Sequence, residues 1–228
     1  MPTDYKYRAF ISYSHKDEKW ASWLHKALET YRVPKYLVGQ DTAFGKVPDK
    51  LGKVFRDREE LASAHSLGHE LEQALADSAC QIVICSPNAA KSHWTTEEFK
   101  AYKRLGRENL IFCLIVGGEP YASGNPETAD DECFPEALRF RAGPDGELTD
   151  QPSEPIAADA RAHGDGKPNA KLKLISGMLG VGFDNLKQRE HQRKQRRMLA
   201  ITAAASVGMV FTSGLAGYAV IQKNEAER

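Results

Sequence analysis

The chain has 228 residues, of which 41% are hydrophobic, so it is long enough to bury a full core and lacks the composition of a chain that stays unfolded throughout. Lysine plus arginine and aspartate plus glutamate both number 31, and this balance gives no overall electrostatic footprint for nucleic acid. The four cysteines have no C-x-x-C spacing and three lie in apolar runs, which is typical of buried reduced thiols in a reducing compartment.

The amino-terminal part of the chain begins with a strand and an amphipathic helix. Residues 7–14, YRAFISYS, form a short apolar run that predicts the first strand. The polar turn at residues 14–17 can cap the helix that follows it. From Glu18 onward, apolar residues recur at helical spacing and stop before Pro34, so a core-packing helix is expected there.

A long connection leads to the second strand. Residues 34–52 are punctuated by glycine and proline, and connections of this length are often functional or mobile. Residues 53–55 open a strand that runs into a charged loop. A small-residue loop at 62–68 then precedes a predicted helix at residues 69–77.

The centre of the chain carries two strands expected to be buried on both faces. Residues 80–85 and 109–116 are almost unbroken apolar runs, the pattern of strands inside a parallel sheet. Residues 119–168 are rich in Pro, Gly and Asp, which indicates surface loops, with residues 156–158 as a short edge strand. The alternation of strands and helices predicts an α/β fold with a doubly wound parallel sheet of five strands.

The helix after the central strand carries Trp94 and Glu98, which fall on one face because they are four residues apart. One aromatic ring and one carboxylate can therefore share a pocket. A structural explanation is also available: with Thr95 as N-cap, Glu98 would complete a capping box, and Trp94 and Phe99 would form a hydrophobic staple. Local sequence leaves both explanations open.

The carboxyl-terminal part predicts a membrane anchor. After a domain at residues 1–168, residues 169–197 form an amphipathic helix that turns basic, residues 198–221 are uncharged and long enough to span a bilayer, and residues 222–228 form a short tail. The basic flank predicts that the α/β domain is cytoplasmic, on a single-pass protein of the cell inner membrane. Met1 leads into a polar stretch, so no cleavable secretory signal is expected.

In a doubly wound sheet, ligands bind beyond the carboxyl ends of the strands where the strand order reverses. Three loops should meet there, beginning at residues 13–14, 57–58 and 86–87. Neither G-x-G-x-x-G nor G-x-x-x-x-G-K-[ST] occurs, which disfavours Rossmann dehydrogenase and P-loop chemistry. The ends of the first and third strands also lack the acidic residues of a two-component receiver.

Four segments in this order, FISYSHKD, VFRD, IVICSP and SHWTTEEF, resemble the Toll/interleukin-1 receptor (TIR) domain family, especially bacterial membrane-anchored members. The resemblance covers residues 7–105 and extends to the strand at 110–116. It implies a flavodoxin-like sheet, self-association through TIR domains, and in many members hydrolysis of NAD+ at the nicotinamide glycosidic bond.

The same resemblance implies roles for individual residues. Its Trp-x-x-x-Glu motif corresponds to Trp94 and Glu98, so Glu98 would be the catalytic carboxylate. The residues implied to bind the substrate are Trp94, Tyr13, Ser14, Asp57, Arg58 and Gly68. NAD+ is expected as the substrate, with no cofactor, no metal and no nucleic-acid partner.

Two departures and two alternatives accompany this hypothesis. The loop at residues 57–68 is longer than is usual in the family, and residues 34–52 have no clear counterpart. The first alternative to an NAD+ hydrolase of bacterial anti-phage immunity is a signalling scaffold without activity. The second is a metal hydrolase using His65 and His69, for which no convincing third ligand is found.

Overall fold

The computed structural model describes residues 5–56, 67–143 and 147–188, together with single positions farther along the chain. The side chains of residues 67–69, 93–97 and 142 are outside this description. The chain divides into two compact units, Met1–Phe183 and Asp184–Arg228. The first unit therefore ends later than residue 168, where the sequence predicted the domain boundary.

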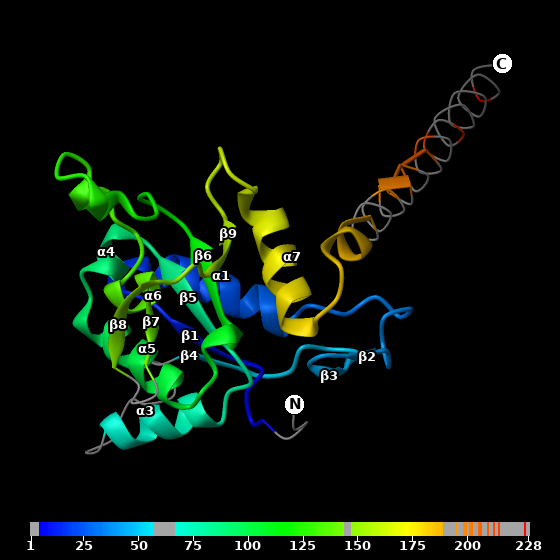
Figure 1. The fold of residues 1–228 in the computed structure, drawn as a ribbon. Coiled ribbons are helices and arrows are strands. Elements are labelled where there is room, and N and C mark those ends of the chain that lie inside the picture. The colour runs from blue at the N-terminus through cyan, green and yellow to red at the C-terminus, as the bar shows by residue number, and fades with distance from the viewer. Residues whose placement is uncertain are drawn as a thin grey trace. The chain divides into compact units, whose positions relative to one another are not determined.

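A five-stranded parallel sheet forms the centre of the first unit (Figure 1). Its strands, in spatial order, are β4 (Val54–Arg56), β1 (Ala9–Ser12), β5 (Gln81–Cys85), β6 (Ile111–Ile115) and β9 (Ile156–Asp159). Chain order thus runs outward from β1 first to β4 and then, on the other side, through β5, β6 and β9. The predicted flavodoxin-like doubly wound sheet is confirmed, and the predicted short strand near residue 156 lies at its edge.

The two central strands are buried along their whole length, as their apolar sequences predict. Every residue of β5 and β6 is buried, and the strands pair in register with Val83 opposite Cys113. Gln81 is the one strongly polar residue of β5, and its amide donates a hydrogen bond of 2.7 Å to the buried hydroxyl of Ser12 on β1. All four cysteines are buried free thiols, as predicted.

Helices and short hairpins complete the unit. They are η1 (His15–Asp17), α1 (Glu18–Glu29), β2 (Asp41–Thr42), β3 (Gly45–Lys46), α3 (Leu67–Ala76), α4 (Pro87–Ala90), α5 (His93–Arg104), η2 (Glu108–Leu110), η3 (Ala122–Gly124), η4 (Ala129–Asp131), α6 (Glu136–Arg139), β7 (Phe140–Ala142), β8 (Leu148–Pro152) and α7 (Gly166–Leu179). The region predicted as surface loops thus contains an antiparallel hairpin, β7–β8, and short helices.

Helices cover both faces of the sheet. α1 contacts α7 and β4, and α7 contacts β6 and β9, whereas α3 and α6 pack against α5. In Figure 1, α1 and α7 lie on one side of the sheet and α3, α5 and α6 on the other. Leu172, Ile175 and Leu179 of α7 are buried, so this helix, predicted to start the juxtamembrane segment, is part of the core.

α1 also holds the outer edge of the sheet. The backbone amide of Val54 on edge strand β4 donates to Oε1 of Glu29 at 3.0 Å, and its carbonyl lies 3.1 Å from Nε2 of His25. His25 and Glu29 are one turn apart on α1 and are 3.5 Å from each other. One helix therefore satisfies the outward-facing backbone groups of Val54.

The predicted membrane span, residues 198–221, lies mostly outside the described residues. Among the described part of the chain, no helix has both the length and the apolar character needed to cross a bilayer.

Candidate active site

A buried hydrogen bond joins the loops that follow the first and third strands of the sheet. β1 and β5 are neighbours, with Ser12 opposite Val83. Ser86 comes directly after β5, and its hydroxyl donates to Oδ2 of Asp17 at 2.6 Å. Both side chains are buried. The prediction that these two loops meet is confirmed, and the loop after the second strand, residues 57–66, lies outside the described residues.

Ser86 also begins helix α4. Its Oγ accepts hydrogen bonds from the backbone amides of Asn88 and Ala89, at 3.2 and 3.1 Å. Pro87 occupies the first helical position, where its fixed φ suits the helix and its missing N–H is not needed. One hydroxyl thus caps α4 and binds Asp17. We call this junction of the loops that follow β1 and β5, at Asp17 and Ser86, the crossover; its hydrogen bonds hold the two loops together.

Glu98 lies inside α5 and is buried, with only 4% of the residue exposed. The helix already begins at His93, so Thr95 lies within its first turn and Glu98 lies beyond that turn. The capping box with Thr95 as N-cap is therefore wrong, because Glu98 is too far along to reach the first free amides. Burying an ionisable group is costly, so Glu98 calls for an explanation other than capping.

The other predicted site residues are placed as follows. Tyr13 is buried, including its hydroxyl, and Ser14 is half-buried in extended conformation at the N-cap of η1. Trp94 lies in the first turn of α5, four residues before Glu98, and its side chain is outside the description. Gly68 lies in the first turn of α3, not in the preceding loop as predicted, because the helix starts at Leu67.

The second strand ends at a buried cation that the sequence did not single out. Arg56, the last residue of β4, is 5% exposed, and its guanidinium donates to the hydroxyl of Ser22 on α1. Asp57 and Arg58 follow it directly and lie outside the described residues. Their predicted place in the pocket stays a prediction.

The loops after β6 and β9 form the rim beside this crossover. Gly118 has φ of +73°, and a Cβ there would lie 2.8 Å from the ring of Pro87 and against the carbonyl of Asp131. The guanidinium of Arg161 donates hydrogen bonds to the carboxylate of Asp159, at the end of β9, and to the carbonyl of Gly118. Its hydrogen bonds hold the pKa of Asp159 below its usual range. The rim is thus held together by close packing and by the ion pairs of Arg161 with Asp159 and Glu119.

Sequence reasoning missed Asp17 and Ser86 as partners, because it treated them as a turn residue and a strand stop. The signal for Ser86 was present in its neighbour, since serine before proline at a strand end is typical of an N-cap followed by the first helical position. The partner of that serine is 69 residues away, and no local pattern indicates it.

The strand order and this crossover define a doubly wound α/β domain whose ligand site is expected at the carboxyl ends of β1 and β5. A family model for the TIR domain matches residues 9–132. The chain belongs to the TIR domain family.

Two relatives of known name are similar to this chain. Protein toll of Drosophila melanogaster is 34% identical over 136 residues, which are 58% of this chain and 10% of that protein. The NAD(+) hydrolase ApTIR of Actinoplanes sp. is 26% identical over 220 residues, which are 87% of this chain and 28% of that protein. The chain thus spans about a tenth and about a quarter of the lengths of these relatives.

A solved structure with the same kind of domain is also similar. It is the activated Roq1 resistosome recognising the pathogen effector XopQ (TIR domains), at 22% identity and a TM-score of 0.40, covering 54% of this chain and 66% of that one.

Proposed function

We propose that this chain hydrolyses the N-glycosidic bond of NAD+, releasing nicotinamide and ADP-ribose or its cyclic form, with Glu98 as the catalytic carboxylate. The observation that carries the proposal is the burial of Glu98 inside α5, at a position where helix capping does not explain it. The relative that covers most of this chain is named an NAD(+) hydrolase, which supports the same substrate.

The chemistry needs a carboxylate and little else. The bond between the ribose anomeric carbon and the nicotinamide nitrogen breaks, and its electron pair leaves with the ring, which becomes neutral. Positive charge then develops on the sugar, and a nearby carboxylate stabilises it. Water attacks the anomeric carbon and loses a proton, which completes ADP-ribose. Because nicotinamide leaves as a neutral ring, no strong general acid is required.

The surroundings of Glu98 suit this role in two respects. A buried site excludes water, so the field of a carboxylate acts more strongly on a developing cation than it would in solvent. The helix that carries Glu98 follows β5, and the crossover of β1 and β5 is fixed by Ser86 and Asp17. In this proposal Trp94 and Tyr13 supply aromatic walls, and Arg58 faces the substrate phosphates.

We further propose that activity depends on self-association of TIR domains, in signalling such as bacterial anti-phage immunity. The support for this step is the membership of the TIR family and the family resemblance of the four motifs. A scaffold that uses the same association without hydrolysis is the second candidate.

The test is nicotinamide release from NAD+ by the full chain, at rising protein concentration and on lipid vesicles, for the wild type and Glu98→Gln. Glutamine keeps the size of the side chain but not its charge, so we expect a loss of at least about 100-fold in rate with an unchanged melting temperature. Glu72→Gln, an exposed change of the same kind on α3, should keep full activity.

The outcomes separate the candidates. Release by the wild type and by Glu72→Gln, but not by the folded Glu98→Gln, establishes Glu98 as the catalytic group. Equal rates for the wild type and Glu98→Gln refute its role. If even clustered wild type releases no nicotinamide, the scaffold becomes the better description.

A further inference from the structure

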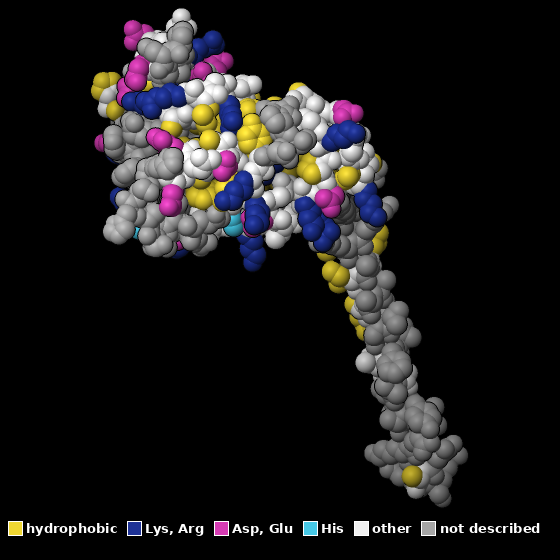
Figure 2. All heavy atoms as spheres, turned by 90° about the horizontal axis from the view of Figure 1, so that it is seen from below, with side chains coloured by type: hydrophobic (Ala, Val, Ile, Leu, Met, Phe, Trp, Pro, Cys, Tyr) yellow, Lys and Arg dark blue, Asp and Glu magenta, His cyan; other side chains and the backbone are white. Residues whose placement is uncertain are grey.

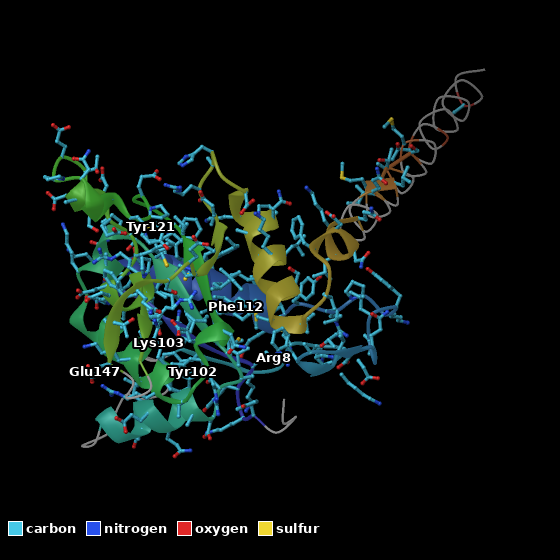
Figure 3. The ribbon with its side chains drawn as sticks, viewed as in Figure 1. Arg8, Tyr102, Lys103, Phe112, Tyr121 and Glu147 are labelled. Carbon is cyan, nitrogen blue, oxygen red and sulfur yellow. The ribbon has the colours of Figure 1, made fainter. Side chains whose placement is uncertain are left out.

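A cavity opens at the end of the sheet opposite to the candidate active site. It has a volume of about 280 Å³ and lies where β1, β5 and β6 begin, beneath the β2–β3 hairpin and the last turn of α7. Figure 3 shows Arg8 and Phe112, two of its lining residues, near the lower end of α7. The cavity involves the connection at residues 34–52, for which neither the sequence nor the proposed hydrolysis provides a role.

Positive charge gathers around this cavity. Lys6, Arg8, Lys46 and Lys53 line it, and its described lining contains no aspartate or glutamate. The backbone places two of them side by side, since the amide of Arg8 donates to the carbonyl of Lys53 at 2.7 Å. Figure 2, which views the molecule from below, shows Lys and Arg side chains on this face. The cavity is therefore complementary to an anion.

Arg8 is the cation set deepest in the cavity. Its Nη2 donates to the carbonyl of Met178 at 2.6 Å, and within the described ranges it forms no ion pair with a carboxylate. Burial lowers the pKa of Arg8, and the nearby Cys80 opposes this shift without cancelling it. A bound anion would offset the cost of that burial.

Four aromatic side chains also line the cavity. Tyr5, Tyr7, Phe44 and Phe112 contribute rings, and the ring of Tyr7 lies 4.9 Å from the ammonium group of Lys6. These rings offer flat apolar surfaces next to the cations, an arrangement that suits a ligand with a planar ring and a charged group.

Two glycines of α7 make room for the aromatic walls. A Cβ at Gly177 would lie 2.7 Å from the ring of Phe112, and one at Gly180 would lie 2.9 Å from the ring of Phe44. Gly180 ends α7 in the left-handed conformation, with φ of +66°. The two glycines thus leave room for both rings beside the carboxyl end of α7.

We propose that this cavity binds a mononucleotide, with the phosphate on Arg8, Lys46 and Lys53 and the base against Phe44. Its volume of about 280 Å³ lies just below the usual range of ligand pockets, about 300 to 1,000 Å³, which favours a mononucleotide over a dinucleotide such as NAD+. The site is separate from the proposed hydrolysis, which takes place at the other end of the sheet.

The experiment is calorimetric titration of the full chain with AMP, and with adenosine, which has the same base but no phosphate. The charge-reversed pair Lys46→Glu plus Lys53→Glu should weaken AMP binding at least tenfold. The matched pair Lys19→Glu plus Lys26→Glu changes the net charge equally on exposed positions of α1, away from the cavity. This pair should change the affinity for AMP less than twofold. Adenosine should bind at least tenfold more weakly than AMP.

A second variant tests the aromatic contact. Phe44→Ala should weaken AMP binding about fivefold or more while leaving the protein folded, as checked by its melting temperature. The proposal is overturned if the wild type does not bind AMP, if both lysine pairs weaken binding equally, or if Phe44→Ala binds as tightly as the wild type. None of these outcomes depends on nicotinamide release, so this site and the hydrolase stand or fall separately.

Discussion

The hydroxyl of Ser86 lies 2.6 Å from Oδ2 of Asp17 and joins the ends of two strands that are remote in sequence. The same oxygen accepts the first free amides of α4. Because the side chain of Asp17 is buried, the hydrogen bond that it receives is costly to remove.

Ser86→Ala removes both the cap and the donor to Asp17. We expect the free energy of unfolding to fall by about 2 kcal/mol, measured by chemical denaturation. Ser86→Thr, which keeps a hydroxyl, should lose clearly less. A change below about 0.5 kcal/mol in Ser86→Ala would show that the crossover is not held by this hydrogen bond.

Gly118→Ala should destabilise the domain by about 2 kcal/mol or more. The backbone has φ of +73°, and the added methyl group would meet the ring of Pro87 and the backbone of Asp131. Gly124→Ala is the matched control, because nothing lies within 4 Å of its Cβ position and its φ is not positive. Thermal unfolding of the two variants checks the prediction, which fails if they melt together.

Glu132 organises the loop after β6 and should make its stability depend on pH. Its carboxylate accepts hydrogen bonds from the amides of Tyr121, Ser123 and Phe134, at 3.1, 3.1 and 2.8 Å. Burial acts to raise the pKa of Glu132, but the amides of Phe134 and Ser123, the hydroxyl of Ser123 and the charge of Arg139 outweigh it, so the net pKa is lowered.

A lowered pKa in the folded state means that the carboxylate stabilises the fold above its unfolded pKa of about 4.3, and that this stability is lost as the pH falls through the folded value. Glu132→Gln should therefore unfold more easily at pH 7, by about 1 to 3 kcal/mol. The deficit should shrink in acid, where the wild type is also protonated. Denaturation curves of both proteins at pH 7 and pH 3 test this, and a constant deficit would contradict it.

The cysteines should be unreactive in the folded protein. Burial raises the pKa of Cys80 and of Cys133 to about 12, and it raises that of Cys85 as well. Because the thiolate is the reactive form, a thiol reagent at pH 8 should modify them only after unfolding. Counting modified thiols by mass spectrometry, with and without denaturant, tests this. Rapid modification of the native chain would disagree with the burial described here.

The sheet was predictable from sequence where burial on both faces leaves an unbroken apolar run. Residues 80–85 and 109–116 became β5 and β6 with ends shifted by two residues or fewer. The hairpin β7–β8 was missed because its strands are short and no residue of β8 is buried, so they carry no clear alternating pattern. The position of the hairpin depends on long-range contacts, such as the hydrogen bond from Lys103 to the carbonyl of Phe140. The two residues are too far apart in the sequence for a local pattern to indicate this contact.

The site was predictable in outline and not in detail. The positions of the strand ends follow from chain topology, so the crossover was located correctly. The sequence allowed α5 to start near Ser92 or near Thr95, and the structure starts it at His93, next to the first of these. Only the interpretation of Thr95 as N-cap was wrong, because the pattern Thr95-x-x-Glu98 also occurs inside a helix that begins earlier. α7 was recognised as a helix, but apolar spacing alone does not say which surface it covers, and Leu172 and Ile175 pack on the sheet.

The contacts of His25 and Glu29 on α1 with the backbone of Val54 affect how copies of this domain can assemble. An edge strand with unpaired backbone groups can form hydrogen bonds with a strand of another molecule, which leads to aggregation. Here His25 and Glu29 occupy the outward-facing amide and carbonyl of Val54 on β4, so a strand that pairs there would have to displace two hydrogen bonds first. Pairing of a second copy along β4 at Val54 is therefore disfavoured, which favours helices, loops or the opposite edge for the self-association proposed above.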